Sequence, residues 1–364
     1  MSITYLVDDQ DPAIEYLCTV TKQSKVRDNY LNNTYTTIAG SECGGGWFKY
    51  KFHGTSVRVS SRLSSPDADY AVQVDISPML QRSGNGVYQS PELVDGREHS
   101  IVYAVGNQSL SPAFDYLTVT AGHTTRLHGK TIIVDDEDDE IQYSGNWRTE
   151  PISPPTVAFD YTSSPYLDTT HWSNTVGDSV TYSFKGSSVA VYGVIPFSQL
   201  FPNRTISASY AIDGGEPEIR SFTPSIEGHP IAMSQFFLSE RLSEGRHTLV
   251  VEVTDIPDLT MLGFGLDFIT YSASFDSLSA AGRGDAESAE ALGGHALVWQ
   301  PVLGALLGFV ALLIGIFGWL WWRKRKQAKA RAERTSRAHV IENWKSRGIQ
   351  EGDKVKNGSL TADV

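Results

Sequence analysis

The sequence predicts an all-β protein made of two tandem antiparallel β-sandwiches, followed by one C-terminal transmembrane α-helix. Three observations lead to this fold class. Short segments that alternate apolar and polar residues, separated by turn residues, fill the region before residue 272. The two halves of that region carry the same signals in the same order. Near the C-terminus, residues 302–322 contain no charged side chain.

The strand signals are clearest in the second half of this region. In residues 180–184 apolar and polar side chains alternate, as they do in a strand with one buried face. The same alternation marks the segments 188–192, 205–212, 248–253 and 266–271. Turn residues interrupt it at Lys185-Gly186, Asp213-Gly214-Gly215 and Glu244-Gly245. Because helical periodicity is absent from the sequence before residue 300, these short strands predict antiparallel β-sandwiches.

Five blocks of the first half recur in the second half. They pair residues 6–16 with 133–143, 30–35 with 166–171, 46–57 with 178–189, 95–101 with 244–249, and 114–118 with 266–270. In the second pair, Tyr35 takes the place of His171. The period is domain-sized, which indicates a duplicated domain rather than a solenoid. We expect a degenerate first copy at 1–122, a linker at 123–130 and a second copy at 131–274.

The uncharged run is predicted to form a transmembrane helix over residues 300–322. As a helix, the 21 uncharged residues 302–322 would span about 31 Å, which matches a hydrocarbon core. Tryptophans flank the run, as in an interfacial belt, namely Trp299, Trp319, Trp321 and Trp322. The small and polar stretch 275–299 predicts a flexible juxtamembrane stalk.

Charge is distributed unevenly around this segment. The tail 323–364 holds 12 Lys and Arg against 5 Asp and Glu, whereas the rest of the chain holds 18 against 37. The basic tail predicts a single-pass protein with a cytoplasmic C-terminus and extracellular or lumenal β domains. The acidic bulk argues against nucleic-acid binding, because it repels phosphates.

The predicted topology has further consequences. The sequons at Asn32, Asn107 and Asn203 lie on the outer side, where they predict N-glycosylation. The first 16 residues show no leader peptide, so either the span itself directs translocation or the start is incomplete.

The membrane segment predicts partners of its own. The lipid bilayer is the first of them. The small residues Gly304 and Gly308 would let two helices approach closely, which allows a homodimer. The basic stretch 323–337 either binds anionic lipid headgroups or only fixes the topology.

The two cysteines, Cys18 and Cys43, both lie on the predicted outer side. A disulfide persists in such a compartment, so we expect these residues to be bridged. The alternative is two separate thiols, and two cysteines alone make no credible metal site.

The motifs of the second copy resemble a galactose-binding-like jelly roll. They run in the order VDD-x-D, IQYSGNW, YLDTTH, GDSVTYSFKGSSVAVYG, SYAIDGG, LSEGRHTLVVEV and LDFITY. More narrowly, the tandem arrangement is similar to the ectodomains of fungal single-pass membrane proteins. This resemblance implies a jelly-roll fold, and many members of that broad fold bind glycans.

Acidic residues recur near the first and last strands of both copies. Asp135 or Asp136 would lie near Asp267, and Asp8 or Asp9 would lie near Asp115, if both copies fold as sandwiches. Oxygen ligands of this kind suit a structural Ca²⁺ ion. Alternatively, the carboxylates cap strand ends and turns by accepting backbone N–H bonds.

Aromatic residues gather in one loop-rich stretch of the second copy. Trp172, with His171, Tyr161 and Tyr166, has the composition of a glycan-binding surface. Alternatively, Trp172 fills the end of the sandwich. The strand-start residues His99 and His247 are interpreted as turn-packing residues.

No catalytic motif is recognisable, and the acidic run 135–140 is not a separated acid–base pair. We therefore expect a non-enzymatic glycan-binding or adhesion module at the cell surface. A structural protein that contacts other proteins is the main alternative, and a membrane-tethered glycoside hydrolase is a third.

Overall fold

A computed structural model describes residues 2–24, 30–40, 43, 46–105, 112–149, 164–198, 203–226, 228–257 and 262–281. They all belong to one compact unit, Met1–Ser288. None of the helices in these residues is both long and apolar enough to cross a membrane. The predicted transmembrane helix and cytoplasmic tail lie outside the described residues, as does most of the predicted stalk.

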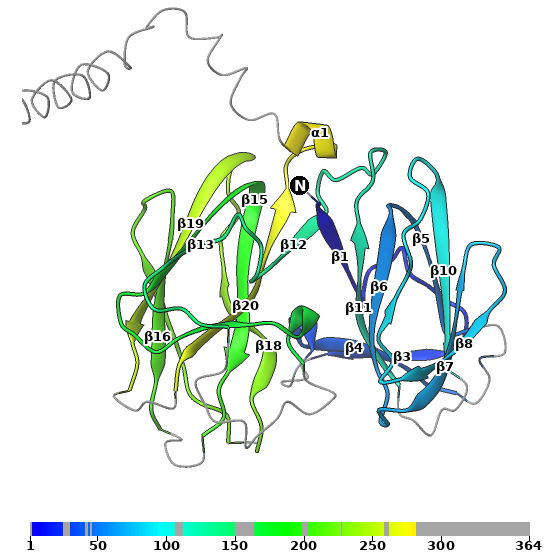
Figure 1. The fold of residues 1–364 in the computed structure, drawn as a ribbon, viewed down its shortest axis with the longest axis horizontal. Helices are drawn as coiled ribbons and strands as arrows, with labels where there is room; N and C mark the ends of the chain where they lie inside the picture. Colours follow the sequence, from blue (N-terminus) through cyan, green and yellow to red (C-terminus); the bar gives the residue numbers. More distant parts are fainter. Residues whose placement is uncertain are drawn as a thin grey trace, which may run out of the picture. The chain divides into compact units, whose positions relative to one another are not determined.

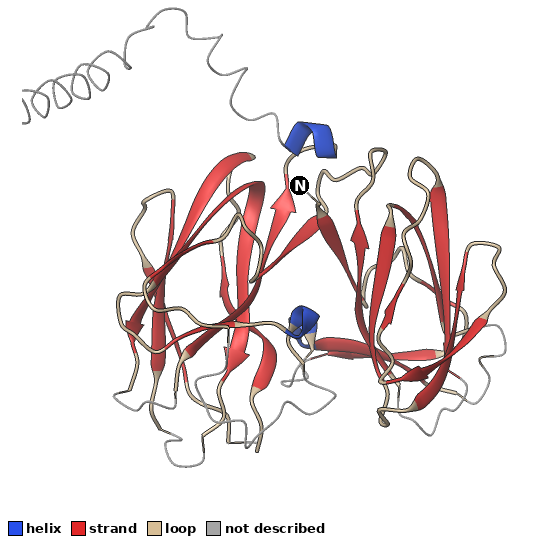
Figure 2. Ribbon diagram, viewed as in Figure 1, coloured by secondary structure: helices blue, strands red, loops and turns tan. Residues whose placement is uncertain are grey.

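The first domain is a sandwich of antiparallel strands (Figures 1 and 2). One sheet has the order β2-β5-β10-β7-β8, and the other contains β1, β11, β6, β9, β4 and β3. The bounds are β1 Thr4–Asp8, β2 Glu15–Tyr16, β3 Val20–Ser24, β4 Thr34–Ile38, β5 Phe48–His53, β6 Ser56–Arg62, β7 Ala68–Val74, β8 Leu80–Gly84, β9 Tyr88–Gln89, β10 Glu98–Val105 and β11 Ala113–Thr120. A short 3-10 helix, η1 (Leu31–Asn33), precedes β4.

The second domain repeats this arrangement with its own strands. Their bounds are β12 Thr131–Asp135, β13 Gln142–Ser144, β14 His171–Ser173, β15 Ser179–Ile195, β16 Ile206–Ile212, β17 Glu218–Phe222, β18 Ile231–Leu238, β19 Gly245–Asp255 and β20 Phe264–Ala273. A 3-10 helix, η3 (Tyr166–Asp168), precedes β14. The prediction of antiparallel β-sandwiches is confirmed.

The long strand β15 replaces two strands of the first domain. Its first half pairs with β13 and β19, and its second half pairs with β18 and β20. The chain passes from one sheet to the other at Gly186, as it does at Gly54 between β5 and β6. A Cβ atom at Gly186 would lie 2.5 Å from the Ser272 carbonyl oxygen. Glycine is therefore required at this crossing by the close approach of two backbones.

Pairing of two edge strands joins the domains. β1 and β12 are antiparallel, and Tyr5 faces Ile132 in their register. The segment between the domains is packed rather than extended, since Leu127 is fully buried and its N–H donates to the Asp276 carbonyl at 3.0 Å. The first residues of the predicted stalk are packed too, because Phe275 is buried and helix α1 (Leu278–Ala281) contacts the core. Residues 275–281 therefore pack against the folded domains, unlike the flexible stalk predicted there.

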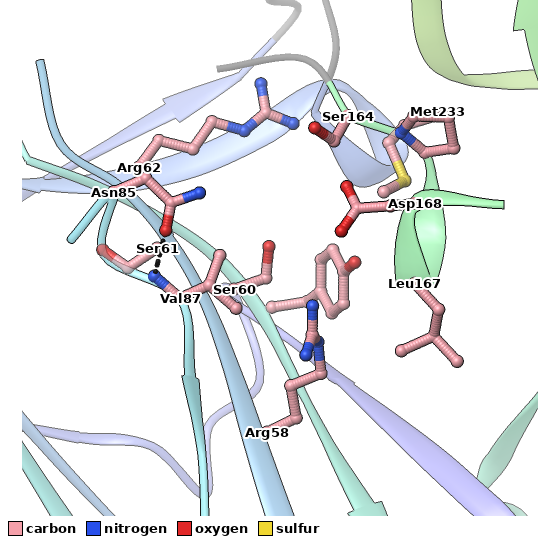
Figure 3. Close-up of a pocket in the computed structure, with 12 residues that line it drawn as sticks. Arg58, Ser60, Ser61, Arg62, Asn85, Val87, Ser164, Leu167, Asp168 and Met233 are labelled. Atoms are coloured by element: carbon pink, nitrogen blue, oxygen red, sulfur yellow. Dashed lines mark hydrogen bonds between the residues drawn. The ribbon is translucent and has the colours of Figure 1, made fainter. Parts of the chain in front are cut away.

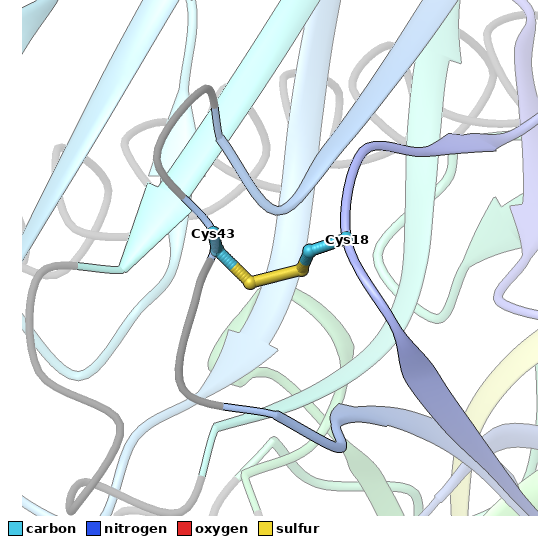
Figure 4. Close-up of a disulfide and its surroundings, with 2 residues drawn as sticks. All are labelled: Cys18 and Cys43. Carbon is cyan, nitrogen blue, oxygen red and sulfur yellow. A yellow bond between two sulfur atoms is a disulfide. The ribbon is translucent and has the colours of Figure 1, made fainter.

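A disulfide links Cys18 to Cys43 (Figure 4). It closes a loop with a sequence separation of 25 residues in the first domain, near the start of β3. The second domain has no cysteine, so this bridge belongs to the first copy alone.

Candidate functional site

The aromatic residues predicted to bind glycan lie instead in a hydrophobic cluster. Trp172 is 4% exposed and Tyr166 is 6% exposed. Their cluster draws on both domains, with Leu6, Leu31 and Tyr116 from the first and Ile133, Tyr166, Trp172, Ala190, Tyr192, Val194, Ala232, Met233 and Phe268 from the second. A buried ring offers no face to a sugar, so the structure corrects the prediction for these two residues. Trp172 is a packing residue, as in the alternative interpretation.

The burial of Trp172 has a local cause. It lies on β14, which pairs with β20 so that Trp172 faces Gly265. A Cβ atom at Gly265 would lie 2.9 Å from the indole ring, so this glycine makes room for the ring. His171 is partly exposed, and its Nδ1 lies 2.6 Å from Asp136 Oδ2. Tyr161 lies outside the described residues.

Each domain buries one aspartate just after its first strand. Asp9 accepts hydrogen bonds from the hydroxyls of Thr34 at 2.7 Å and Thr36 at 2.6 Å. Asp136 accepts one from Thr169 at 2.7 Å and contacts His171. Thr36 is therefore the structural counterpart of His171. The sequence comparison paired Tyr35 with His171 and is wrong by one residue. It matched Tyr30 with the identical Tyr166, although the loops before these residues differ in length.

A second buried aspartate lies on the last strand of each domain. Asp115 accepts the Leu31 N–H at 2.9 Å and lies 3.3 Å from the Arg62 guanidinium. Asp267 accepts the Tyr166 N–H at 2.8 Å, but its Oδ2 is buried without a hydrogen-bond partner in the described residues. By strand register, Val194 occupies the position that Arg62 has in the first domain.

Burial shifts the pKa values of Asp9, Asp135, Asp115 and Asp267. Burial, the main cause, raises the pKa of Asp9 to about 6 and that of Asp135 to about 7. The pKa values of Asp115 and Asp267 are raised well above the usual range for the same reason. The Arg62 charge opposes the shift at Asp115, whereas backbone N–H groups oppose it at Asp267.

The residues predicted to bind calcium contact protein groups of their own domains. Among the described residues, no group of three or more His, Cys, Asp and Glu side chains could hold a metal ion. Asp8, at the end of β1, accepts the Gln10 N–H at 2.9 Å and the Asn32 amide at 2.8 Å. These contacts are those of carboxylates that cap turns and loops.

The strand-start histidines have matching contacts in the two domains. His99 Nδ1 lies 2.9 Å from Asp75, and His247 Nδ1 lies 2.6 Å from Asp213. The hydrogen bond with His247 lowers the pKa of Asp213. Both histidines also contact a backbone carbonyl through Nε2. They are turn-packing residues, as predicted.

A cavity of about 270 Å³ lies where the two domains meet. Arg58, Ser60 and Arg62 line it from the first domain, because alternate residues of β6 share one face. Asp168 of η3 and Met233 of β18 line it from the second domain. Figure 3 shows Arg58 and Ser60 directed toward the space that Asp168 faces from the other side.

The charged groups of this cavity differ in how firmly they are held. Arg62 is fixed by Asp115 and lies over the Tyr30 ring, 4.2 Å from its centroid. Within the described part of the chain, neither Arg58 nor Asp168 has an ion-pair partner within 4.0 Å. The Asn85 side-chain Oδ1 accepts the Val87 N–H at 3.1 Å, which orients the amide at the rim. Donors and acceptors from two domains thus converge on one small space.

The sequence contained part of this signal. The alternation in SVRVSSR predicts a strand with Arg58, Ser60 and Arg62 on one polar face. It does not indicate that this face meets the second domain, because that depends on the pairing of β1 with β12.

The sequons differ in their surroundings. Asn203 is exposed. Asn32 is exposed as well, but its amide donates to Asp8 and its Oδ1 accepts the Tyr192 hydroxyl of the second domain at 2.9 Å. Asn107 lies outside the described residues.

Comparison with known proteins gives partial similarities to solved structures. Neither a protein-family model nor a curated protein matches the chain. A two-domain esterase active on acetylated mannans has 18% identity and a TM-score of 0.32, over 41% of this chain and 38% of the esterase. A family two carbohydrate esterase from Cellvibrio japonicus has 14% identity and a TM-score of 0.26, over 41% and 35%.

A third similar structure is itself a tandem. The CBM22-1–CBM22-2 tandem domain of Paenibacillus barcinonensis Xyn10C has 11% identity and a TM-score of 0.26, over 74% of this chain and 93% of the tandem. The chain matches less than half the length of either esterase. Similarity at this level assigns no ligand or activity to this chain.

Proposed function

We propose that this chain is a non-catalytic glycan-binding protein whose ligand occupies the cavity between its two domains. The observation that carries the proposal is the convergence of Arg58, Ser60 and Asp168 on that cavity from both domains. Small-molecule sites are concave, commonly lie at domain interfaces, and contain a few placed polar groups.

The chemistry of the lining suits sugar hydroxyls. Each hydroxyl both donates and accepts, so a sugar needs donors and acceptors close together. Arg58 and the Asn85 amide supply donors, and the Asp168 carboxylate accepts. The volume, about 270 Å³, lies just below the usual range for small-molecule pockets, which favours one or two sugar residues.

The proposal includes display at a membrane. It rests on the uncharged run 302–322 and the basic tail that follows it. With this topology the cavity faces the outside, where glycans are abundant. Resistance of the full chain to extraction by alkaline carbonate is the expected result, and release into the soluble fraction would contradict it.

A glycan array probed with the full chain tests the binding. The variants Arg58→Gln and Asp168→Asn remove a donor and an acceptor of the cavity, and Lys51→Gln is a control on the exposed face of β5. We expect saturable binding that falls at least tenfold in both cavity variants and is unchanged in the control. Absence of binding by folded protein would overturn the proposal and favour the protein-contact alternative.

A second assay tests the proposal that the chain is not catalytic. Glycans that bind on the array are incubated with the full chain in solution for a prolonged time and are then analysed by mass spectrometry. Unchanged glycans are the expected result. Cleaved products that depend on the chain would show a hydrolase instead.

A further inference from the structure

The two domains meet through matching strands, so their contact is approximately twofold symmetric. Tyr5 of β1 lies opposite Ile132 of β12, which holds the same place in the second domain. Thr4 lies opposite Ile133, which is the counterpart of Leu6, and Leu6 lies opposite the counterpart of Thr4. In such a contact, whatever one domain presents to the other is met again, with the roles exchanged, on the far side of the axis. The two sides can therefore be compared residue by residue.

On one side of the axis, the contact is closed by Tyr192 of β15. Its hydroxyl donates to Asn32 Oδ1 of η1 at 2.9 Å, and the Gln235 amide donates to the same hydroxyl at 3.0 Å. The ring stacks on Phe268 with centroids 4.6 Å apart, and Tyr192 is only 4% exposed. One six-membered ring with its hydroxyl thus spans the space between a strand of the second domain and the 3-10 helix of the first.

On the other side of the axis, Ser60 of β6 has the position of Tyr192. Ser60 lies opposite Tyr116 in its ladder, as Tyr192 lies opposite Phe268. Both ladders shift register directly beside this pair, which supports the correspondence. Because serine is much shorter than tyrosine, β6 does not reach across to the 3-10 helix that it faces.

The space beyond Ser60 is the cavity between the domains (Figure 3). Ser60 and Leu167 of η3 both line it, and Leu167 has the place of Asn32, since each is the middle residue of its 3-10 helix with a φ of 53°. A serine and a leucine cannot form the hydrogen bond that Tyr192 forms with Asn32, because leucine has no polar side-chain atom. The cavity of about 270 Å³ therefore lies where the other side of the axis has a tyrosine ring.

Two charged residues of the cavity have uncharged counterparts on the closed side. Arg58 corresponds to Ala190 by strand register, and Asp168 corresponds to Asn33 by its place in the 3-10 helix. The closed side thus has a methyl group and a neutral amide where the open side has a guanidinium and a carboxylate. The open side therefore combines the missing ring with polar groups suited to an occupant.

We propose that Ser60 determines which ligand this cavity accepts, by leaving room for a single pyranose ring in the place that corresponds to the ring of Tyr192. The ligand is the glycan proposed above, on which this inference rests, and Ser60 restricts its bound part to one sugar residue, free or at the end of a chain. On the closed side one six-membered ring and its hydroxyl span the gap, so the matching gap holds one ring and not two. Arg58 and Asp168 supply a donor and an acceptor for the hydroxyls of that ring.

Isothermal titration calorimetry of the full chain tests the size of the bound unit. The probes are the methyl pyranosides of glucose, galactose, mannose, xylose and N-acetylglucosamine, and the linear tetrasaccharides of the same sugars. We expect at least one methyl pyranoside to bind saturably, and its tetrasaccharide to bind with an affinity within about threefold. Tetrasaccharide binding that is at least tenfold tighter would overturn the proposal, because it would show contacts beyond a single ring.

Variants at position 60 separate size from hydrogen bonding. Ser60→Tyr copies the closed side and should weaken binding at least tenfold, whereas Ser60→Ala keeps the space and should weaken it less. Ser83→Tyr, on the exposed edge strand β8, is the control for an added tyrosine and should bind like the parent. Thermal melts show which variants are folded, and Ser60→Leu, which also fills the space, takes the place of Ser60→Tyr if that variant does not fold.

The outcomes distinguish the role of Ser60 from the proposed function. Parent-like binding by folded Ser60→Tyr, or an equal loss in Ser60→Ala and Ser60→Tyr, would overturn the role of Ser60 and leave glycan binding intact. A positive glycan array without binding of any methyl pyranoside would do the same. Absence of binding in both assays by the folded parent would overturn the role of Ser60 and the proposed function together.

Discussion

Replacing Asp267 with asparagine is expected to remove a pH-dependent cost to folding. Asp267 is fully buried and has no cationic partner among the described residues, so burial raises its pKa well above the usual range. The native state therefore holds a proton that the unfolded chain releases above a pKa of about 3.9. As the pH rises above this value and up to the native pKa, the parent loses about 1.4 kcal/mol of stability per pH unit through this group. Below the unfolded-state pKa the cost is absent.

Asparagine keeps the shape of the protonated acid and does not titrate. The assay is urea unfolding of parent and Asp267→Asn at pH 5, 6 and 7. The difference in unfolding free energy between them should shift in favour of the variant as the pH rises, by up to about 1.4 kcal/mol for each pH unit below the native pKa. The exposed Asp69 of β7, changed to asparagine, is the control for a loss of surface charge. A difference for Asp267→Asn that stays constant with pH would refute the assignment of a raised pKa to this residue.

The remaining predictions concern packing and covalent linkage. Trp172→Ala should lower the unfolding free energy by about 3–5 kcal/mol, because it empties a buried site, and chemical denaturation measures this. A loss of glycan binding with unchanged stability would contradict the packing role. Gly186→Ala should lower the unfolding free energy by about 1–3 kcal/mol through the clash with a neighbouring carbonyl, and Tm should fall with it. Gly245→Ala, opposite it in the ladder, has open space and should leave both unchanged. Equal effects in thermal melts would refute the argument. Reduction of Cys18–Cys43 should cost about 3 kcal/mol, given its loop, and unfolding with and without reductant tests it.

The two copies have kept one backbone and diverged in side chains. The pairs Asp9 and Asp136, Asp115 and Asp267, and His99 and His247 occupy matching places. The charged residues around them differ, since Arg62 has no counterpart in the second domain. The cavity between the domains lies where the copies meet, which is where a duplicated fold can acquire function without altering its core.

The sequence alone determined the β class, the duplication and the turn residues, because these depend on local patterns. Alternation in residues 180–184 reports one buried face whatever the strand packs against. The repeat correctly paired Asp9 with Asp136, because the residues around both aspartates have the same spacing. It paired His171 with Tyr35 instead of Thr36, because no regular period constrains the loop that contains them.

Tertiary structure decided which surfaces are exposed. From the sequence, Trp172 is equally compatible with an exposed glycan-binding surface and with a buried packing role. A short aromatic segment has no periodicity that distinguishes the two roles. The pairing of β14 with β20 buries Trp172 against Gly265, and the pairing of β1 with β12 brings the domains together and turns Arg58 toward Asp168. That pairing depends on which strands have open edges after each sandwich has formed. It is a property of the folded domains that no local window of sequence contains.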